Sequence, residues 1–321
     1  MTERKGIAVA GTILVDNIYE ISAYPSLGEL TQIRSIKRAA GGLVPNNGIG
    51  LKKIEPSLPI YAIGKVGNDE AGRYVIETLK ENNVDTVGIK VSADERTSFT
   101  EVMSIIGGQR TFFTYAGASA SFGVDDIPWD DIPCKMLHLG YFLLLDKVDG
   151  GDGEKILREA KQRGIITSID LVSENSDRYS CVIPCLKYVD NLILNELEAG
   201  KLCNIEPRLE NLELMTKKLF EMGVRERVII HTPEIGVCSS KNGFVARPTY
   251  RLPAGYVKGK TGAGDAFCSG ALIAIEQGAS DEEILILAEA AAVASLSAAD
   301  ATSGLKEKSL LPRSEKDITS M

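Results

Sequence analysis

Short apolar segments alternate with segments of helical periodicity along most of this chain, and this alternation constrains the fold more than any other feature. The apolar segments are bounded by glycine or aspartate and lie at residues 7–9, 60–63, 136–139, 165–169, 191–194 and 227–230. Nearly every position in them is apolar, as in strands that are covered on both faces. Helical spacing of apolar residues occurs at residues 71–81, 153–163, 209–222 and 282–298. The sequence therefore predicts an α/β core, a mostly parallel sheet with helices on both faces.

Two segments interrupt this alternation. Residues 13–36 show no clear helical pattern, and residues 91–115 contain strand-like runs of Thr, Val, Phe and Tyr. Gly107 and Gly108 stand between two of these runs, which predicts a β-hairpin. We therefore expect a small inserted sheet that acts as a lid over a site, and a pair of long surface loops is the alternative. The predicted lid comprises residues 13–36 and 91–115, and the predicted core comprises residues 1–12, 37–90 and 116–321.

Charge and composition argue against several classes of protein. The 321 residues include 36 basic and 44 acidic side chains, a formal net charge of −8, so the chain lacks the broad positive field that binds nucleic acid. It has no run of about 18 apolar residues that could cross a membrane. Two histidines and six cysteines in a chain of this length fit neither a His-rich metal site nor a disulfide scaffold.

The N-terminal segment has one feature of a signal peptide. Arg4 and Lys5 precede an apolar stretch, but Asp16 and Asn17 follow it without a small-residue cleavage pattern. We expect the stretch to be a buried first strand. The sequence as a whole predicts a cytoplasmic protein without nucleic-acid or membrane partners.

The glycine-rich segment at residues 257–267 carries the clearest chemistry. Small and apolar residues recur at helical spacing after Asp265, so we expect a helix to begin at Gly262, Ala263 and Gly264. The free amide groups of such a helix start bind anions. A carboxylate beside them suits removal of a proton from a hydroxyl that receives a phosphoryl group. An aspartate that only stabilises the helix dipole is the alternative.

The same segment nearly matches a phosphate-binding P-loop. Ala254, Gly259, Lys260 and Thr261 have the P-loop spacing, with alanine in place of the first glycine. A P-loop is normally followed by a parallel sheet with a metal-binding aspartate, whereas the residues after Thr261 indicate helix and tail. A P-loop NTPase therefore remains only as an alternative.

The motifs of the whole chain, in their order, resemble the ribokinase-like (PfkB) family of carbohydrate kinases. The resemblance implies a three-layer α/β/α core with a β-sheet lid and covers essentially the whole chain. The residues that carry it are Asp16 with Gly28 and Glu29, Gly41 and Gly42 with Asn46, the Gly64 to Gly72 segment, Tyr188 to Asp190 with Asn195 and Glu198, and Gly262 to Phe267.

The resemblance implies roles for these residues in phosphoryl transfer. Asp265 would be the general base, and the amides of Gly262, Ala263 and Gly264 would form an anion hole. Asn195 and Glu198 would help to place Mg²⁺ near the ATP phosphates, in part through water. The alternative for this pair is a helix cap with a solvated glutamate.

Substrate and nucleotide contacts follow from the same resemblance. Asp16, Gly41, Gly42 and Asn46 would bind hydroxyl groups of the substrate beneath the closing lid, and the alternative for Asp16 is a turn aspartate. The expected ATP contacts are Asn195, Lys260, Thr261, Thr232 and Gly236.

Two segments depart from the family pattern. The family has aspartate and two threonines before its Gly-Ala-Gly-Asp motif, and the aspartate helps to bind an activating monovalent cation. This chain has Gly259, Lys260 and Thr261 there, so we expect weak or absent activation by K⁺. After residues 227–230, His231 and Pro233 replace a threonine and a glycine, which leaves the nucleotide preference open with ATP as the default.

The expected activity is transfer of the ATP γ-phosphoryl group to a hydroxyl of a small sugar or polyol. No cluster of Arg or Lys near Asp16, Gly42 or Asn46 would hold a substrate phosphate. Tyr141 and Phe142 would offer aromatic surface that also suits a nucleoside, so a nucleoside kinase is the alternative, and a sugar sensor without turnover is a second. The resemblance also implies a homodimer formed through the lid sheet.

Overall fold

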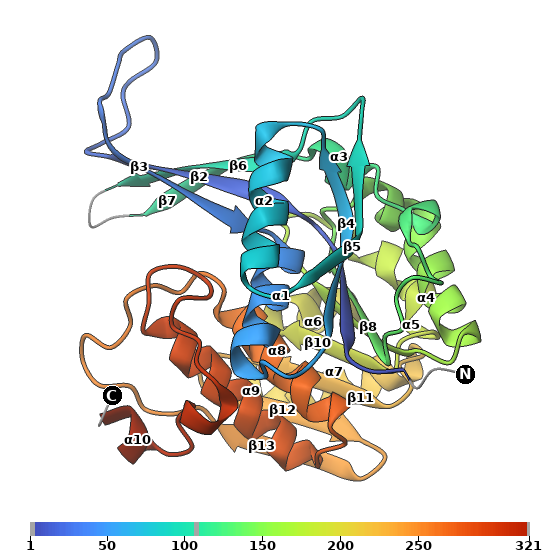
Figure 1. Cartoon of the computed structure of the whole chain (residues 1–321). Coiled ribbons are helices and arrows are strands. Elements are labelled where there is room, and N and C mark those ends of the chain that lie inside the picture. The colour runs from blue at the N-terminus through green and yellow to red at the C-terminus, as the bar shows by residue number, and fades with distance from the viewer. Residues whose placement is uncertain (1–3, 106–108, 320–321) are drawn as a thin grey trace.

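The computed structural model describes residues 4–105 and 109–319. These residues form a sheet of nine strands between two layers of helices, and a separate sheet of four strands that projects from one end (Figure 1). The predicted hairpin turn at Gly107 and Gly108 lies outside the described residues.

The large sheet has the strand order β13-β12-β11-β10-β9-β8-β1-β4-β5. All pairs from β5 to β11 are parallel, and β12 and β13 add an antiparallel edge. All six predicted strands are present. Their residues are apolar at nearly every position because helices cover both faces of the sheet. The strands are β1 (Ile7–Gly11), β4 (Ile60–Gly67), β5 (Asp85–Ser92), β8 (Met136–Phe142), β9 (Ile166–Leu171), β10 (Asn191–Asn195), β11 (Arg227–His231), β12 (Ile235–Ser240) and β13 (Gly243–Pro248).

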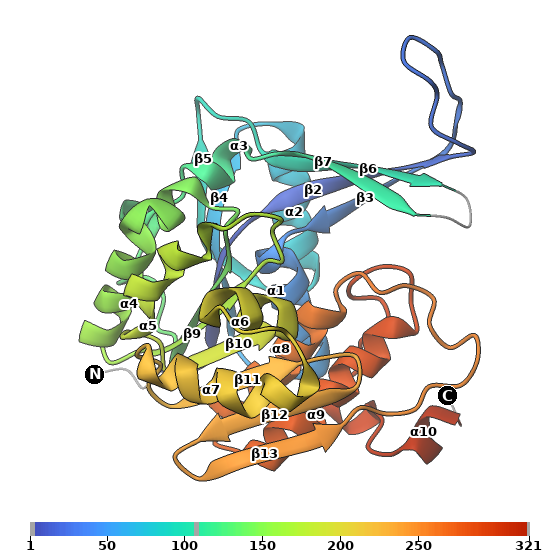
Figure 2. The same cartoon turned by 180° about the vertical axis from the view of Figure 1, so that it is seen from behind.

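Helices cover both faces of this sheet. One layer holds α1 (Leu43–Ile54), α2 (Glu70–Glu81), α8 (Ala263–Glu276) and α9 (Asp281–Leu296) (Figure 1). The other holds α4 (Gly153–Gln162), α5 (Ile183–Leu186), α6 (Glu196–Cys203) and α7 (Leu212–Glu221) (Figure 2). Shorter segments are α3 (Gly117–Ala120), α10 (Glu315–Thr319) and the single turns Val124–Asp126, Val148–Asp152, Arg178–Val182, Leu209–Asn211 and Lys308–Leu310.

The core divides into two clusters, one on each side of the sheet. Ile7 and Val9 of β1 pack toward α1, α2, α8 and α9, whereas Ala8 and Ala10 pack toward the other helical layer. Successive residues of a strand point to opposite faces, so a strand that is apolar at every position contributes to both clusters. The predicted three-layer core is confirmed.

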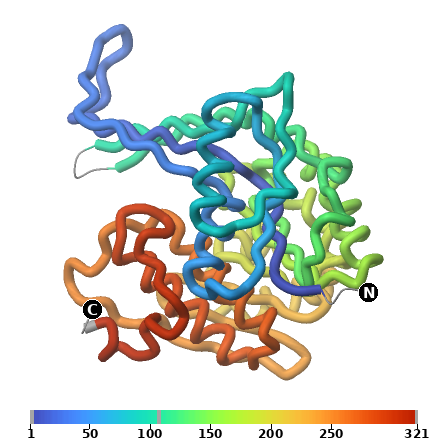
Figure 3. The backbone as a smooth tube through the Cα atoms, in the orientation of Figure 1, coloured from blue at the N-terminus to red at the C-terminus, as the bar shows by residue number. Residues whose placement is uncertain are grey.

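The small sheet has the order β3-β2-β6-β7. Its strands are β2 (Leu14–Ile21), β3 (Ile33–Gly41), β6 (Ser98–Ile105) and β7 (Arg110–Tyr115). Both segments that interrupt the α/β alternation contribute strands, so the separate sheet is confirmed in place of surface loops. The β2–β3 connection, residues 22–32, extends away from the rest of the molecule (Figure 3).

One strand of the small sheet, β3, ends beyond the expected lid boundary. β3 continues to Gly41, which pairs with Leu14, so residues 37–41 lie in the small sheet although we expected them in the core. Conversely, β5 of the large sheet continues to Ser92. Pairing partners far away in sequence fix these ends. None of the helices in the described part of the chain is long and apolar enough to span a membrane.

Candidate active site

A cavity of about 280 Å³ lies where the parallel strands β8 to β11 end and α8 begins. In open α/β sheets, ligands bind at this carboxyl edge of the strands. A hollow of about 520 Å³ beside α6 is larger but mostly apolar, and it shares only Ser173 with this cavity. The polar and glycine residues that line the smaller cavity are Tyr141, Asp170, Ser173, Asn195, Glu198, His231, Gly262, Gly264, Asp265 and Cys268.

The start of α8 is built by glycine. Gly262 has φ +77°, and a Cβ atom there would lie 2.3 Å from Cβ of Ala301, so both conformation and space require glycine. The helix then runs for 14 residues, and its first amides have no partners within the helix. The predicted helix start is confirmed, and it places an anion-binding helix end beside the cavity.

Asp265 lies in the first turn of α8 and is only 8% exposed. Its Oδ2 accepts a hydrogen bond from Asn46 Nδ2 at 2.9 Å, and the Tyr141 hydroxyl donates to both carboxylate oxygens at 2.9 Å. Burial and the neighbouring charge of Asp170 raise the pKa of Asp265 to about 6, against the lowering effect of these two donors. The carboxylate is therefore ionised at neutral pH but is more basic than an exposed aspartate.

Residues from the start of α1 meet Asp265 and the base of the small sheet. Gly42 has φ +84° and precedes α1, which directs Asn46 to Asp265. A Cβ atom on Gly41 would lie 2.2 Å from Oδ2 of Asp16, so glycine makes room for this carboxylate. Asp16 lies in strand β2 rather than in a turn, and burial raises its pKa to about 6.

Asn195 and Glu198 form a reciprocal cap at the start of α6. Asn195 Oδ1 accepts from the Glu198 amide at 2.9 Å, and Glu198 Oε2 accepts from the Asn195 amide at 3.1 Å. Glu198 also accepts from the Ser173 hydroxyl at 2.9 Å. The helix cap of the alternative interpretation is thus present, but its glutamate is 5% exposed and not solvated.

The charge of Glu198 has no basic partner at ion-pair distance among the residues that the structure describes. Burial, with a smaller effect of Asp170, raises its pKa to about 8. A buried carboxylate in a polar cavity is stabilised by a cation. Carboxylate and amide oxygens are ligands that suit Mg²⁺, which binds few protein groups and keeps several waters. Asn195 and Glu198 therefore fit a water-coordinated Mg²⁺.

The segment after β11 lies next to the cavity but turns its side chains elsewhere. The Thr232 hydroxyl accepts from the amides of Glu234 and Ile235 and thereby closes a turn. Gly236 faces α9, where a Cβ atom would lie 3.0 Å from Glu289. His231 does line the cavity, and burial lowers its pKa to about 4, so the ring is neutral at pH 7.

The loop before α8 is in contact with the small sheet. Arg110 of β7 donates from Nη1 to the Thr261 hydroxyl at 2.8 Å. Lys260 adjoins Thr261 on this loop, two residues before Gly262. A Cβ atom on Gly259 would lie 2.8 Å from the Ala299 carbonyl oxygen, so this position has no room for the aspartate of the family pattern.

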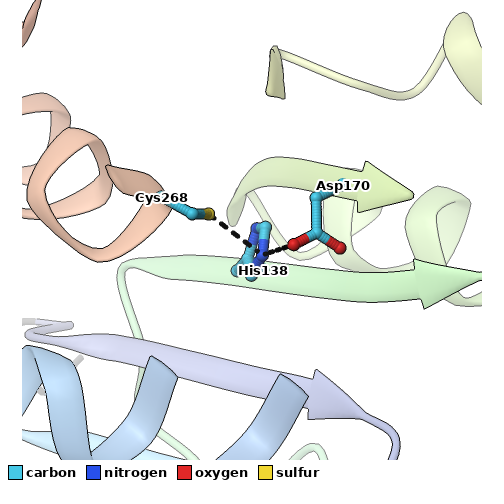
Figure 4. A group of neighbouring side chains, drawn as sticks. All are labelled: His138, Asp170 and Cys268. Carbon is cyan, nitrogen blue, oxygen red and sulfur yellow. Dashed lines mark hydrogen bonds and ion pairs between the residues drawn. The ribbon is translucent and has the colours of Figure 1, made fainter. Parts of the chain in front are cut away.

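Three polar residues near Asp265 were not expected at the site from the sequence: His138, Asp170 and Cys268. His138 lies between Cys268 and Asp170, with Nε2 3.4 Å from Sγ and 3.5 Å from Oδ2 (Figure 4). Asp170 also accepts from the Tyr141 amide at 2.7 Å. A polar residue directly after a buried apolar strand is a sequence signal that could have identified Asp170. Nothing in the local sequence pairs it with His138 or Cys268.

A buried aspartate at a helix start, at the carboxyl edge of a parallel sheet that carries a second, smaller sheet, is the arrangement expected of a small-molecule kinase with the ribokinase fold. The sequence matches the family described as pfkB family carbohydrate kinase over residues 5–308, and the chain belongs to this family. It is thus a carbohydrate kinase.

Comparisons with individual proteins agree. Ribokinase from Arabidopsis thaliana is 25% identical over 291 residues, which cover 89% of this chain and 74% of that protein. Probable fructokinase-7 from the same plant is 27% identical over 278 residues, 82% of this chain and 76% of that protein. Two solved structures share the fold. A. thaliana ribokinase complexed with ribose and ATP has a TM-score of 0.81 at 22% identity over 99% of this chain and 98% of its own. A nucleoside kinase from Methanocaldococcus jannaschii has a TM-score of 0.77 at 18% identity over 99% of both chains.

Proposed function

We propose that the protein transfers the γ-phosphoryl group of ATP to a hydroxyl of a small, unphosphorylated sugar or polyol. The observation that carries this proposal is the buried Asp265 carboxylate at the glycine-built start of α8, inside a polar cavity. Asp265 accepts the proton of the acceptor hydroxyl while the hydroxyl oxygen bonds to the γ-phosphorus of ATP. The bond between the γ-phosphorus and the β–γ bridging oxygen breaks, and ADP is released. The amides of Gly262, Ala263 and Gly264 stabilise charge on the moving group.

The nucleotide side of the site contains the proposed metal ligands. Asn195 and Glu198 would hold Mg²⁺ in part through water, and Asn195 would also adjoin the ATP phosphates. When bound, the ion neutralises phosphate charge. Lys260 and Thr261 contact the nucleotide next to the anion hole. Thr232 and Gly236 act through the shape of the turn after β11, because the Thr232 hydroxyl is engaged in that turn.

The acceptor lies under the inner face of the small sheet. Asp16 pairs with Thr100, and Thr100 pairs with Thr114, so their side chains share one face with Arg110. The Arg110–Thr261 hydrogen bond joins this face to the α8 loop. We propose that Asp16 and the Gly41 and Gly42 backbone bind acceptor hydroxyls there, and that Asn46 orients Asp265.

Sugar substrates are favoured over nucleosides by the names of the curated relatives, ribokinase and fructokinase. The nucleoside kinase with the same fold, together with the Tyr141 ring in the cavity, keeps nucleosides as the second candidate. A sensor without turnover has no need for a buried base, and ADP release decides this point directly.

The test is ADP release from MgATP across pentoses, hexoses, sugar acids, polyols and nucleosides. We expect a sugar or polyol to stimulate release, and Asp265→Asn to lower the rate by about 10²–10⁴-fold without a loss of thermal stability. If only nucleosides stimulated ADP release, the substrate would be a nucleoside and not a sugar or polyol. A rate that survives Asp265→Asn but is lost in Lys260→Ala would overturn the base assignment and support the P-loop interpretation.

Potassium should have little effect on the rate. Gly259 supplies no carboxylate and has no room for one, and Lys260 adds a positive charge beside it. Rates at equal ionic strength in K⁺ and in tetramethylammonium should agree within about twofold, because position 259 has no carboxylate that would bind K⁺. A large stimulation by K⁺ would contradict this expectation.

A further inference from the structure

Tyr141 has a backbone conformation that tyrosine rarely adopts. Its φ is +58°, and Leu143 two residues later has φ +81°. The pairing of β8 with β9 shifts register in this segment, between Leu139 and Phe142. The left-handed region is strained for a non-glycine residue, and such residues gather where function requires them. The strained backbone at Tyr141 therefore indicates a functional role for its side chain.

Two contacts hold Tyr141 in this conformation. The first is the hydrogen bond from its amide to Asp170 Oδ1, and the other oxygen of Asp170 faces His138. His138 in turn contacts Cys268, which lies one turn after Asp265 on α8 (Figure 4). The end of β8 is therefore tied to the helix that carries the base. The second contact is the hydrogen bond from the Tyr141 hydroxyl to Asp265.

The Tyr141 hydroxyl donates to Oδ1 and Oδ2 of Asp265 at equal distances of 2.9 Å. Asn46 donates to Oδ2 alone. Each carboxylate oxygen can accept two hydrogen bonds, and the single Tyr141 proton is shared between the two oxygens. Oδ2 also accepts from Asn46, so Oδ1 keeps more free acceptor capacity. The two donors fix the plane of the carboxylate and make its oxygens unequal.

We propose that Tyr141 is a positioning residue for the base: its hydroxyl fixes the Asp265 carboxylate so that Oδ1 takes the proton of the acceptor. This inference rests on the proposed function. The proton moves from the acceptor hydroxyl to Oδ1, and Tyr141 keeps its own proton throughout. The strained backbone of β8 persists because it brings the phenol to this carboxylate.

The charged and polar groups around Asp265 predict in which direction its pKa shifts when the Tyr141 hydroxyl is removed. The groups that face it are Tyr141 and His138 from β8, Asp170 from β9, Cys268 from α8 and Asn46 from α1. The Tyr141 hydrogen bond opposes the effects of burial and of Asp170 on the pKa of Asp265. Removing the hydroxyl should therefore raise this pKa above its value of about 6.

The experiment compares the wild-type protein with Tyr141→Phe, which keeps the ring and loses the donor. Tyr141→Gly is the second variant, because glycine adopts the same φ without strain and keeps the test open if phenylalanine is not tolerated. Tyr179→Phe is the matched control, since that buried hydroxyl donates to the carbonyl oxygens of Val172 and Glu174 and not to Asp265. The Asp265 carboxyl is titrated by ¹³C NMR and assigned by its absence in Asp265→Asn.

Tyr141→Phe should raise the midpoint of the Asp265 titration by about one pH unit, the size expected for one hydrogen bond to a charged group. Tyr141→Gly should raise it by less, because loss of the ring also lets water reach the carboxylate. The acidic limb of kcat/KM should move by the same amount, and kcat above the limb should fall about tenfold, the effect of a base that is less well oriented. Tyr179→Phe should leave all three unchanged. In an Asp265→Asn background, Tyr141→Phe should have no further effect on kcat.

An unshifted NMR titration in both Tyr141 variants would overturn the proposal. So would a loss of kcat that persists in the Asp265→Asn background, because the hydroxyl would then act elsewhere. The NMR measurement needs no turnover, so it stays informative about Tyr141 even if no substrate stimulates ADP release, a result that would count against the proposed function instead.

Discussion

Asp265 has opposing influences on its pKa from residues that are far apart in the chain. Burial and the charge of Asp170 favour the protonated form, while Tyr141 and Asn46 donate hydrogen bonds that favour the carboxylate. Burial wins, and the pKa of about 6 lies between that of a free aspartate and neutrality. This is the range in which a carboxylate is ionised at physiological pH and still accepts a proton readily.

The rate should therefore depend on pH in a defined direction. The proposed reaction needs the ionised form of Asp265, so kcat/KM should fall as the pH drops through about 6. A pH–rate profile of the wild-type protein measures this. Asp16→Asn is the control, because it removes another aspartate whose pKa burial raises, and it should keep the Asp265 limb. A profile that stays flat down to pH 5 would count against Asp265 as the base.

At the scale of single elements, the start of α6 has two roles. The reciprocal hydrogen bonds of Asn195 and Glu198 cap the helix, and the buried Glu198 carboxylate also faces the cavity. Glutamine can make the same cap without the charge. The substitution Glu198→Gln therefore separates the structural role from the proposed metal role.

Glu198→Gln should leave the free energy of unfolding within about 1 kcal/mol of wild type, since the cap is kept. The Mg²⁺ concentration for half-maximal rate should rise about 10–100-fold, as is typical when a group that binds a metal through a water or another ligand is replaced. Denaturant unfolding and Mg²⁺ titration of the rate measure the two effects. An unchanged Mg²⁺ requirement would leave Glu198 as a helix cap only.

The start of α2 joins the two sheets. Asp69 accepts a hydrogen bond from the Gly72 amide and so caps the helix. The same carboxylate accepts from both the amide and the hydroxyl of Thr97, which immediately precedes β6 of the small sheet. This segment is part of the family resemblance, and its geometry shows a structural role for its aspartate.

Asp69→Ala should lower the free energy of unfolding by about 1–2 kcal/mol, the effect of losing a helix cap, with more lost if the Thr97 amide finds no new partner. The hydrogen bonds lower the pKa of Asp69, so the wild-type advantage should be present at neutral pH and should decline as acid protonates the carboxylate. Urea unfolding of both proteins at pH 7 and pH 3 measures this. Equal stability of the two proteins at pH 7 would refute the capping role.

At the scale of the whole molecule, the small sheet is less well covered than the large one. All residues of β7 are exposed. Phe113 and Tyr115 lie on the face of the small sheet opposite to Thr114, and they are 56% and 45% exposed. Ile36 on β3 lies on the same face as Phe113 and is 68% exposed. Contiguous exposed aromatic and aliphatic side chains mark interaction surfaces. They support the proposal that the lid sheets of two copies pack together in a homodimer.

Replacing both Phe113 and Tyr115 by aspartate should separate such a dimer, because both side chains lie on the same exposed face. Two buried aromatic contacts contribute enough that their loss should weaken association by at least about 100-fold. Analytical ultracentrifugation over a range of concentrations measures this, and Phe244→Asp, an exposed aromatic on β13, is the control. A wild-type protein that remains monomeric at high concentration would contradict the proposal.

The sequence by itself determined the layers of the core and the start of α8. Runs of apolar residues and helical periodicity are local properties, so strands such as β1 and β10 and helices such as α2 and α9 follow from them. The glycines at α8 and the lid strands were likewise visible. The edge strands β12 and β13 were not predicted, and the end of β3 at Gly41 depends on its pairing with β2.

The tertiary structure alone decided how the candidate site is assembled. Asn46 and Tyr141 meet Asp265 from positions 219 and 124 residues away. No local pattern indicates that Asn46 donates a hydrogen bond to Asp265, that the Thr232 hydroxyl is engaged in a turn, or that Glu198 is buried. Periodicity depends on neighbours along the chain. Burial, hydrogen-bond partners and the pKa of a carboxylate depend on neighbours in space, which exist only once the sheets and helices have packed.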